Sequence, residues 1–306
     1  MFSSLGSGPS PGGKNAYFTF RAIDNSTFKL SSSTVQYSIN GGKTWQTLNA
    51  NTNSPVIASG NEICWKATAS SGLGTFSSSG KFDAFGNIMS LAAGDNFLTA
   101  SSMGYEQFKA LFKNNTNLVH ASGIYFPDFT YTNCYDEMFW GCSSLVDAPI
   151  LPALRVYGAS YRSMFRDCVS LLAGPELPAT TIYNNCYDSM FCGCNAMVTG
   201  PTILPATDLY ISCYYQMFRD CLNLLRAPDL PAYTLDNYCY NGMFAGCKKM
   251  TYIKCLAVNK SATKCTEWWL PHPYIAEVGT FVKAANTTWP TGDNGIPSGW
   301  IVVDAT

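Results

Sequence analysis

The sequence predicts an α+β chain in three parts: an all-β, sandwich-like N-terminal domain, a solenoid of short repeated coils, and a β-rich C-terminal cap. Alternating apolar and polar residues, separated by Gly, Ser and Asn clusters, run through residues 17–90 and are typical of strands. A nine-residue motif, first present as CYDEMFWGC, then recurs at a nearly constant step, which indicates a repeat architecture. The expected boundaries are a flexible arm at 1–16, the β-sandwich-like domain at 17–100, the solenoid at 101–270 and the cap at 271–306.

The composition excludes some classes of function. Charged residues make up 13% of the 306 residues, and the formal net charge is −1. Neither a basic run that would bind nucleic acid nor an apolar stretch of about 20 residues that would span a membrane is present in the sequence. The N-terminus lacks the basic and apolar regions of a secretory signal, so we expect it to be a flexible arm.

The repeat has a step of about 26 residues. Its Met-Phe pairs are separated by 26, 26, 27 and 26 residues, and a cysteine closes each motif. The repeated methionines and closing cysteines, which we expect to form the core, are Met138, Met164, Met190, Met217, Met243, Cys142, Cys168, Cys194, Cys221 and Cys247. Apolar residues at offsets 0, 1, 4, 5 and 8 predict a short helix, and the proline-bounded segment after it predicts a strand. One helix and one strand per step predict a leucine-rich-repeat solenoid of about five full coils with partial coils at both ends.

The thirteen cysteines have three possible roles. A zinc site needs about four ligands at one point, whereas two cysteines eight residues apart on a helix are separated by about 12 Å. Histidine is rare, with only His120 and His272. Packing in the core is the favoured interpretation, because free cysteine behaves as a small buried hydrophobe. Disulfides between coils and a metal site are the alternatives.

The repeat resembles a known family. The pattern CYxxMFxGC, followed by a leucine and by a Pro-x-Leu-Pro-Ala segment, is similar to the BspA-type leucine-rich repeats of surface proteins of Bacteroidetes and of related phage genes, over about residues 105–270. Ser160 in place of the first cysteine and Leu154-Arg155-Val156 are departures from it. The resemblance implies a binding or adhesive role and carries no catalytic residues.

The chain is therefore expected to be a non-enzymatic binding protein without a cofactor or a metal. The acidic pairs differ from coil to coil, and the sequence carries none of the common hydrolase or phosphate-binding motifs. Two alternatives remain open. One is a structural virion component, a fibre or decoration protein that acts in assembly, and the other is a glycan-active enzyme with two carboxylates.

The binding residues are predicted from departures from the repeat. Arg226 and Tyr252 are the charged and the aromatic members of a variable column on the strand segments. Trp268 stands where the preceding coil has Gly242, and His272 lies between two prolines. The predicted ligand-binding residues are thus Arg226, Tyr252, Trp268 and His272.

The expected partner is a glycan or protein on the surface of a host cell, because aromatic and amide-rich surfaces with little charge suit neutral polar ligands. Contacts with other virion or surface proteins are assigned to the N-terminal domain. The expected location is exterior, on a bacterial cell surface or on a phage virion.

Overall fold

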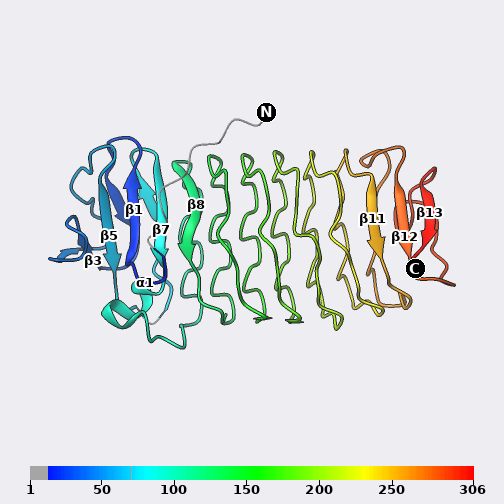
Figure 1. Ribbon diagram of the computed structural model, residues 1–306, viewed down its shortest axis with the longest axis horizontal. Helices are drawn as coiled ribbons and strands as arrows, with labels where there is room; N and C mark the ends of the chain where they lie inside the picture. Colours follow the sequence, from blue (N-terminus) through cyan, green and yellow to red (C-terminus); the bar gives the residue numbers. More distant parts are fainter. Residues whose placement is uncertain (1–12, 70) are drawn as a thin grey trace.

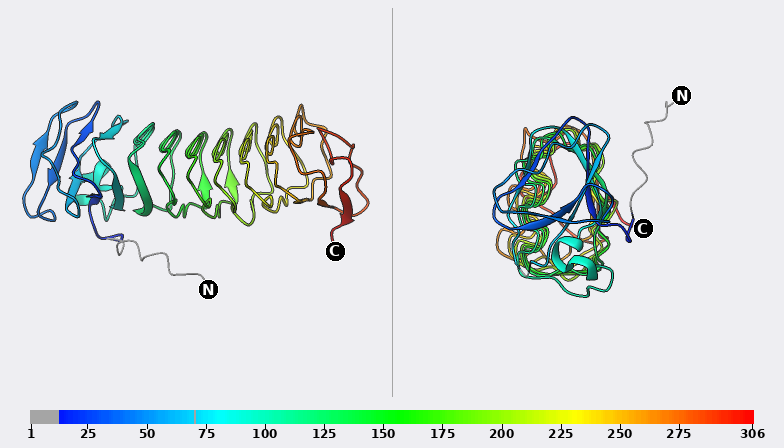
Figure 2. Two further views of the ribbon diagram at one scale, coloured as in Figure 1. Left: turned by 90° about the horizontal axis from the view of Figure 1, so that it is seen from above. Right: turned by 90° about the vertical axis from the view of Figure 1, so that its left-hand side faces the viewer.

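The structure is a computed structural model that describes residues 13–69 and 71–306. The chain forms a linear stack: a β-sheet body at one end, a row of coils, and a small parallel sheet at the other end (Figure 1). Viewed along the stack, the coils superpose on one another (Figure 2). Most of the predicted arm at 1–16 lies outside the described residues.

A six-stranded sheet forms the N-terminal body, in the order β4-β3-β5-β1-β7-β8. Its strands are β1 (Phe18–Ala22), β3 (Val35–Ser38), β4 (Gln46–Leu48), β5 (Glu62–Lys66), β7 (Phe82–Asn87) and β8 (Leu118–Tyr125). A second, two-stranded sheet pairs β2 (Phe28–Leu30) with β6 (Phe76–Ser78). One helical turn, α1 (Ser90–Ala93), and a 3₁₀ turn (Gly94–Asn96) follow β7.

This sheet continues directly into the stack of coils. The pairing of β7 with β8 is parallel, whereas the other strand pairs of the body are antiparallel. The Phe112 ring lies 5.7 Å from Phe20 and 6.0 Å from Phe76, measured between ring centroids. The hydrophobic core therefore extends across residue 100 without interruption.

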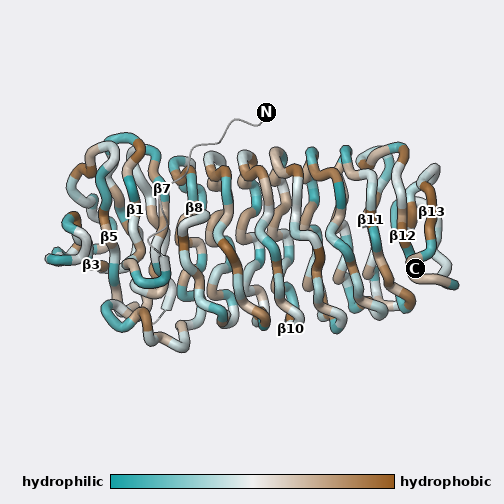
Figure 3. Tube along the Cα trace, in the orientation of Figure 1, coloured by the Kyte–Doolittle hydropathy of each residue, from teal (hydrophilic) through white to brown (hydrophobic). Residues whose placement is uncertain are grey.

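Neighbouring coils are joined by parallel backbone pairing at the step that the sequence repeats. The strand pair β9 (Arg155–Val156) with β10 (Thr181–Ile182) and isolated bridges such as Ala173↔Thr199 connect residues 26 apart. The last coils lead into a parallel sheet of β11 (Tyr252–Cys255), β12 (Thr280–Lys283) and β13 (Ile301–Asp304). Polar and apolar residues are mixed along every coil (Figure 3), as expected where inward and outward positions alternate.

The nine-residue motifs are not helices, so this expectation was wrong. In the first motif, the Asp136 N–H donates to the Asn133 carbonyl at 3.3 Å, as in a β-turn, and the Glu137 N–H donates to Arg162 of the next coil at 2.8 Å. Local and inter-coil hydrogen bonds alternate in this way along the motif. Every fourth residue has positive φ, as at Asn133 (56°) and Gly141 (74°). A ribbon of consecutive turns thus points the same apolar residues of the motif into the interior as a helix would.

The predicted α+β class and its leucine-rich-repeat solenoid are therefore corrected. The only α-helix of the described residues is α1, with four residues, and the chain is nearly all-β. The physical reason is that backbone N–H groups, which would donate to carbonyls of the same segment in a helix, donate to carbonyls of the next coil instead. We use "turn face" for the side of the stack formed by these turn ribbons, and "strand face" for the side formed by the segments that follow each closing cysteine.

Aromatic columns fill the interior. Their rings stack on equivalent rings of neighbouring coils, for example Phe165 on Phe191 at 5.7 Å and Tyr187 on Tyr214 at 5.6 Å. The tyrosine column comprises Tyr135, Tyr161, Tyr187, Tyr214 and Tyr240, all at most 2% exposed. The phenylalanine column comprises Phe112, Phe139, Phe165, Phe191, Phe218 and Phe244, all fully buried. Stacking with these offsets stabilises each coil against its neighbours.

The closing cysteines form a ladder beside the phenylalanine column. Each closing thiol lies 3.0–3.1 Å from the main-chain carbonyl of a phenylalanine in the preceding coil, as Cys194 does with Phe165. A thiol is a weak donor that is small enough for this site. The substitution at Ser160 is also accommodated, since its hydroxyl donates to the Tyr131 carbonyl at 3.0 Å and lies 3.0 Å from the Cys134 sulfur.

Tryptophans close the C-terminal end of the stack. The buried Trp269 ring stacks on Tyr240 of the preceding coil at 6.3 Å and on Trp289 at 5.2 Å, so it ends the tyrosine column. Trp300 is 6% exposed and donates its indole N–H to the Ala276 carbonyl. The turn face just before this end carries the candidate site.

Candidate functional site

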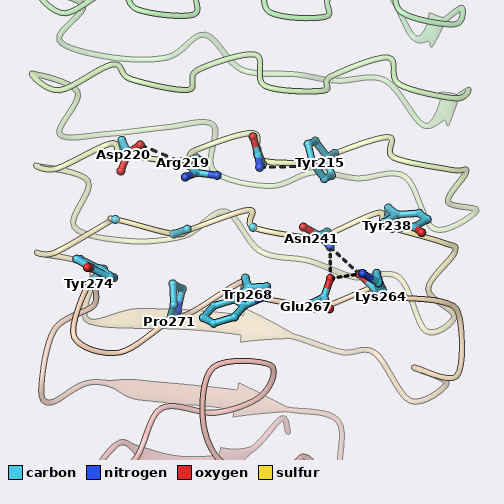
Figure 4. A pocket seen from close by; sticks show the side chains of 14 residues that line it. Tyr215, Arg219, Asp220, Tyr238, Asn241, Lys264, Glu267, Trp268, Pro271 and Tyr274 are labelled. Carbon is cyan, nitrogen blue, oxygen red and sulfur yellow. Dashed lines mark hydrogen bonds and ion pairs between the residues drawn. The ribbon is translucent and has the colours of Figure 1, made fainter.

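A groove of about 630 Å³ lies on the turn face and crosses three successive coils (Figure 4). We call it the notch groove. Its lining residues are Tyr215, Gln216, Arg219 and Asp220 of the first coil, Tyr238, Asn241, Gly242, Ala245 and Gly246 of the second, and Lys264, Glu267, Trp268, Pro271 and Tyr274 of the third. Its volume is typical of a small-ligand site.

Glycines of the middle coil create the notch. Gly242 and Gly246 have φ of 61° and 84° and occupy positive-φ positions of the turn ribbon. The equivalent positions of neighbouring coils carry side chains, Gln216 and Trp268 beside Gly242 and Asp220 beside Gly246. A Cβ on Gly242 would lie 3.0 Å from the Gln216 Cγ atom, so the Gln216 side chain lies directly against this glycine. The middle coil is thus recessed between its neighbours.

Paired polar groups form the rim of the groove. The Lys264 Nζ atom lies 3.2 Å from Glu267 Oε2, and the Asn241 amide donates to the same oxygen at 3.3 Å. On the other wall, Arg219 Nε lies 3.5 Å from Asp220 Oδ2. The two cations and two anions therefore balance, and these side chains are partly ordered before any ligand arrives.

Four aromatic side chains line the groove: Tyr215, Tyr238, Trp268 and Tyr274. Of the aromatic pairs and cation–π contacts among the described residues, none involves any of these four. Trp268 is 57% exposed and Tyr274 is 53% exposed. This separates them from the stacked aromatic columns of the interior, whose faces are covered by neighbouring rings.

Arg226 and Tyr252 lie on the strand face and are brought together there. The Arg226 guanidinium carbon is 4.1 Å from the Tyr252 ring centroid, and Nη2 is 2.9 Å from Asp229 Oδ1. Lys254 also reaches Asp229, at 3.0 Å. Arg226 borders a second groove of about 550 Å³, which shares no lining residue with the notch groove.

His272 is exposed and lines neither groove. Its backbone N–H donates to Asp293 Oδ1 at 3.0 Å, and it follows Pro271 of the notch groove in the chain. The four predicted residues therefore do not form one site: Trp268 lines the notch groove, Arg226 and Tyr252 form a pair on the strand face, and His272 lines neither groove.

Most residues of the groove were not predicted from the sequence. Gln216, Arg219, Glu267 and Tyr274 were not selected, and neither was the glycine pair. The available signal was the occurrence of Gly242 and Gly246 in one motif, CYNGMFAGC, next to a coil with bulky residues at those positions. The ten methionines and closing cysteines predicted for the core are all fully buried, and no group of three or more metal-ligating side chains occurs in residues 13–69 and 71–306.

Comparisons with known proteins give no match. No family model matches the chain, and neither a curated protein nor a solved structure does. The resemblance of the repeat to BspA-type proteins therefore stays a prediction. Over the described part of the chain, no helix has the length and apolar character needed to cross a membrane.

Proposed function

We propose that this chain is a non-enzymatic binding protein that recognises a glycan or protein on a cell surface through the notch groove. The observation that carries the proposal is the set of four unstacked aromatic side chains around a recessed coil. Side chains of this kind offer contact area at low cost in conformational entropy. The stack supplies a rigid frame, because each coil is bonded to both neighbours.

Each part of the groove has a role in this proposal. The glycines give depth, Trp268 and Tyr274 supply apolar surface, and the paired charges with Gln216 and Asn241 offer hydrogen bonds. An exterior location, on a bacterial cell or a phage particle, belongs to the same proposal. It is supported by the low share of charged residues, 13% of the chain.

Binding of the labelled protein to bacterial cells and to arrays of glycans and surface proteins tests this proposal. We expect Trp268→Ala to weaken binding by about thirtyfold, the effect of losing an aromatic anchor. Tyr233→Ala is the matched control, because Tyr233 is 59% exposed but lies outside the groove. Equal binding by both variants and the parent would place recognition elsewhere.

A further inference from the structure

We infer that the occupant of the notch groove is a neutral saccharide, with one sugar ring lying against the indole face of Trp268. This inference rests on the proposed function and names the ligand class of the same site. It depends on three features of the groove: an uncovered aromatic face, balanced charge and unused hydrogen-bond acceptors.

The Trp268 side chain is exposed on a fixed backbone, so its ring is available to a ligand. Its backbone N–H is held by Asn294 Oδ1 at 2.8 Å, and the next residue, Trp269, is fully buried with its indole N–H bonded to the Gly295 carbonyl. These contacts fix the backbone at a residue with φ of 55°. The side chain nevertheless remains more than half exposed. The apolar C–H face of a sugar ring fits such a surface, whereas its hydroxyl groups need polar neighbours.

The polar neighbours are suited to hydroxyl groups and not to an ionic ligand. Both cations of the groove are within 3.5 Å of a carboxylate of the groove. An anionic ligand would have to displace these internal partners, and a cationic ligand would have to displace Arg219 and Lys264. A neutral ligand leaves both pairs in place.

Acceptors for hydroxyl protons remain available on both walls. Among the described residues, Glu267 Oε1 has no hydrogen-bond partner, because Lys264 and Asn241 both bind Oε2. Gln216 donates through Nε2 to the Tyr215 hydroxyl at 3.0 Å, which leaves its amide oxygen free. The walls are two coils apart, roughly 10 Å at the usual strand spacing, so a short oligosaccharide can contact both.

An extended apolar peptide is the competing occupant, and the groove fits it less well. Apart from the aromatic rings, Ala245 and Pro271 are the apolar side chains in the lining. An apolar side chain placed between the ion pairs would remove water from charged groups without replacing their hydrogen bonds. Recognition of a peptide is therefore an outcome of the test and not the expectation.

Calorimetric titration of the full chain with neutral and anionic saccharides tests the inference. The neutral set contains mono- and disaccharides of glucose, galactose, mannose, fucose, N-acetylglucosamine and N-acetylgalactosamine, and the anionic set contains sialyllactose and sulfated disaccharides. We expect binding of at least one neutral sugar, weakened at least about tenfold by Trp268→Ala. Tyr233→Ala should bind like the parent, with all three proteins unfolding at the same temperature.

The outcomes separate this inference from the proposed function. Binding of anionic sugars alone would overturn neutrality. Binding to cells or arrayed proteins that persists after periodate oxidation of the target, with no saccharide bound in solution, would overturn the saccharide while leaving a surface-binding function in place. Failure to bind any cell, array or sugar would overturn both.

Discussion

Replacing one interior ring of the phenylalanine column measures how much the stack depends on buried aromatic surface. Phe191 is fully buried, and its ring centroid lies 5.7 Å from Phe165 and 5.5 Å from Phe218. Truncation to alanine removes a complete buried side chain and two ring contacts. We expect Phe191→Ala to lower the free energy of unfolding by about 4 kcal/mol.

Tyr183→Ala is the matched comparison. The Tyr183 ring has the same kind of neighbours, Tyr157 at 5.4 Å and Tyr210 at 5.5 Å, but it is only half-buried on the outside of the stack. Its truncation should cost about 1 kcal/mol, because the ring contacts are lost without a buried cavity. The difference of about 3 kcal/mol is the contribution of burial.

Urea denaturation followed by tryptophan fluorescence checks both values, with an unchanged dependence on urea as the sign that the same transition is compared. Equal costs for the two substitutions would refute the reasoning, since ring contact and not burial would then dominate. A cost below about 1 kcal/mol for Phe191→Ala would show that the column is not part of the core.

Three further predictions concern thiols, tyrosines and the division of the chain. Burial raises the pKa of the cysteine thiols, that of Cys134 to about 12, so the native protein at pH 8 should react slowly with a thiol reagent. After denaturation without a reductant, most of its thirteen cysteines should titrate as free thiols. A count of at most one free thiol would contradict this. Burial also raises the pKa of the tyrosine column above the ordinary value of 10. Keeping these tyrosines neutral stabilises the folded protein below pH 10, and this contribution is lost as the pH rises further. Absorbance at 295 nm should therefore show these five tyrosines ionising only when the protein unfolds at alkaline pH. Ionisation of all tyrosines in one reversible step would contradict this. A fragment of residues 101–306 should be less stable than the full chain, because Phe112 loses Phe20 and Phe76. A fragment as stable as the full chain would show that residues 101–306 fold independently of the N-terminal domain.

The repeat and its step could be predicted from the sequence, but the backbone conformation of the nine-residue motif could not. The step between Met138 and Met164 is also the step between paired backbones. The inward offsets of the motif fit either a helix or consecutive turns. What distinguishes them is positive φ at residues such as Glu137, Ser163 and Gln216. These residue types give no sign of that conformation, since glycine occupies only some of the equivalent positions.

The candidate site was predictable where it departs from the repeat. Trp268 was selected because a large side chain replaces a small one, and it lines the groove. Arg226 and Tyr252 were selected from one column of the repeat, and they contact each other outside the groove. Gly242 and Gly246 were overlooked because glycine at a turn looks like ordinary turn chemistry. Tyr274 lies where the period ends, so no equivalent coil position indicated that it lines the groove.

Filling the notch is the most direct test that the recessed coil is the binding site. Gly246→Asn places a side chain in the groove, while Gly193→Asn makes the same change in an equivalent coil outside it. The two glycines have φ of 84° and 79°, and a Cβ on either would lie 2.2 Å from the carboxylate of the preceding coil, Asp220 or Asp167. Asn tolerates positive φ and occurs in this column at Asn114.

The measurement is binding of both variants to the cells or array spots that bind the parent protein, after their thermal unfolding has been shown to be equal. We expect Gly246→Asn to lose binding and Gly193→Asn to retain it. Retained binding by Gly246→Asn, or equal loss in both variants, would contradict the assignment of the notch groove as the recognition site.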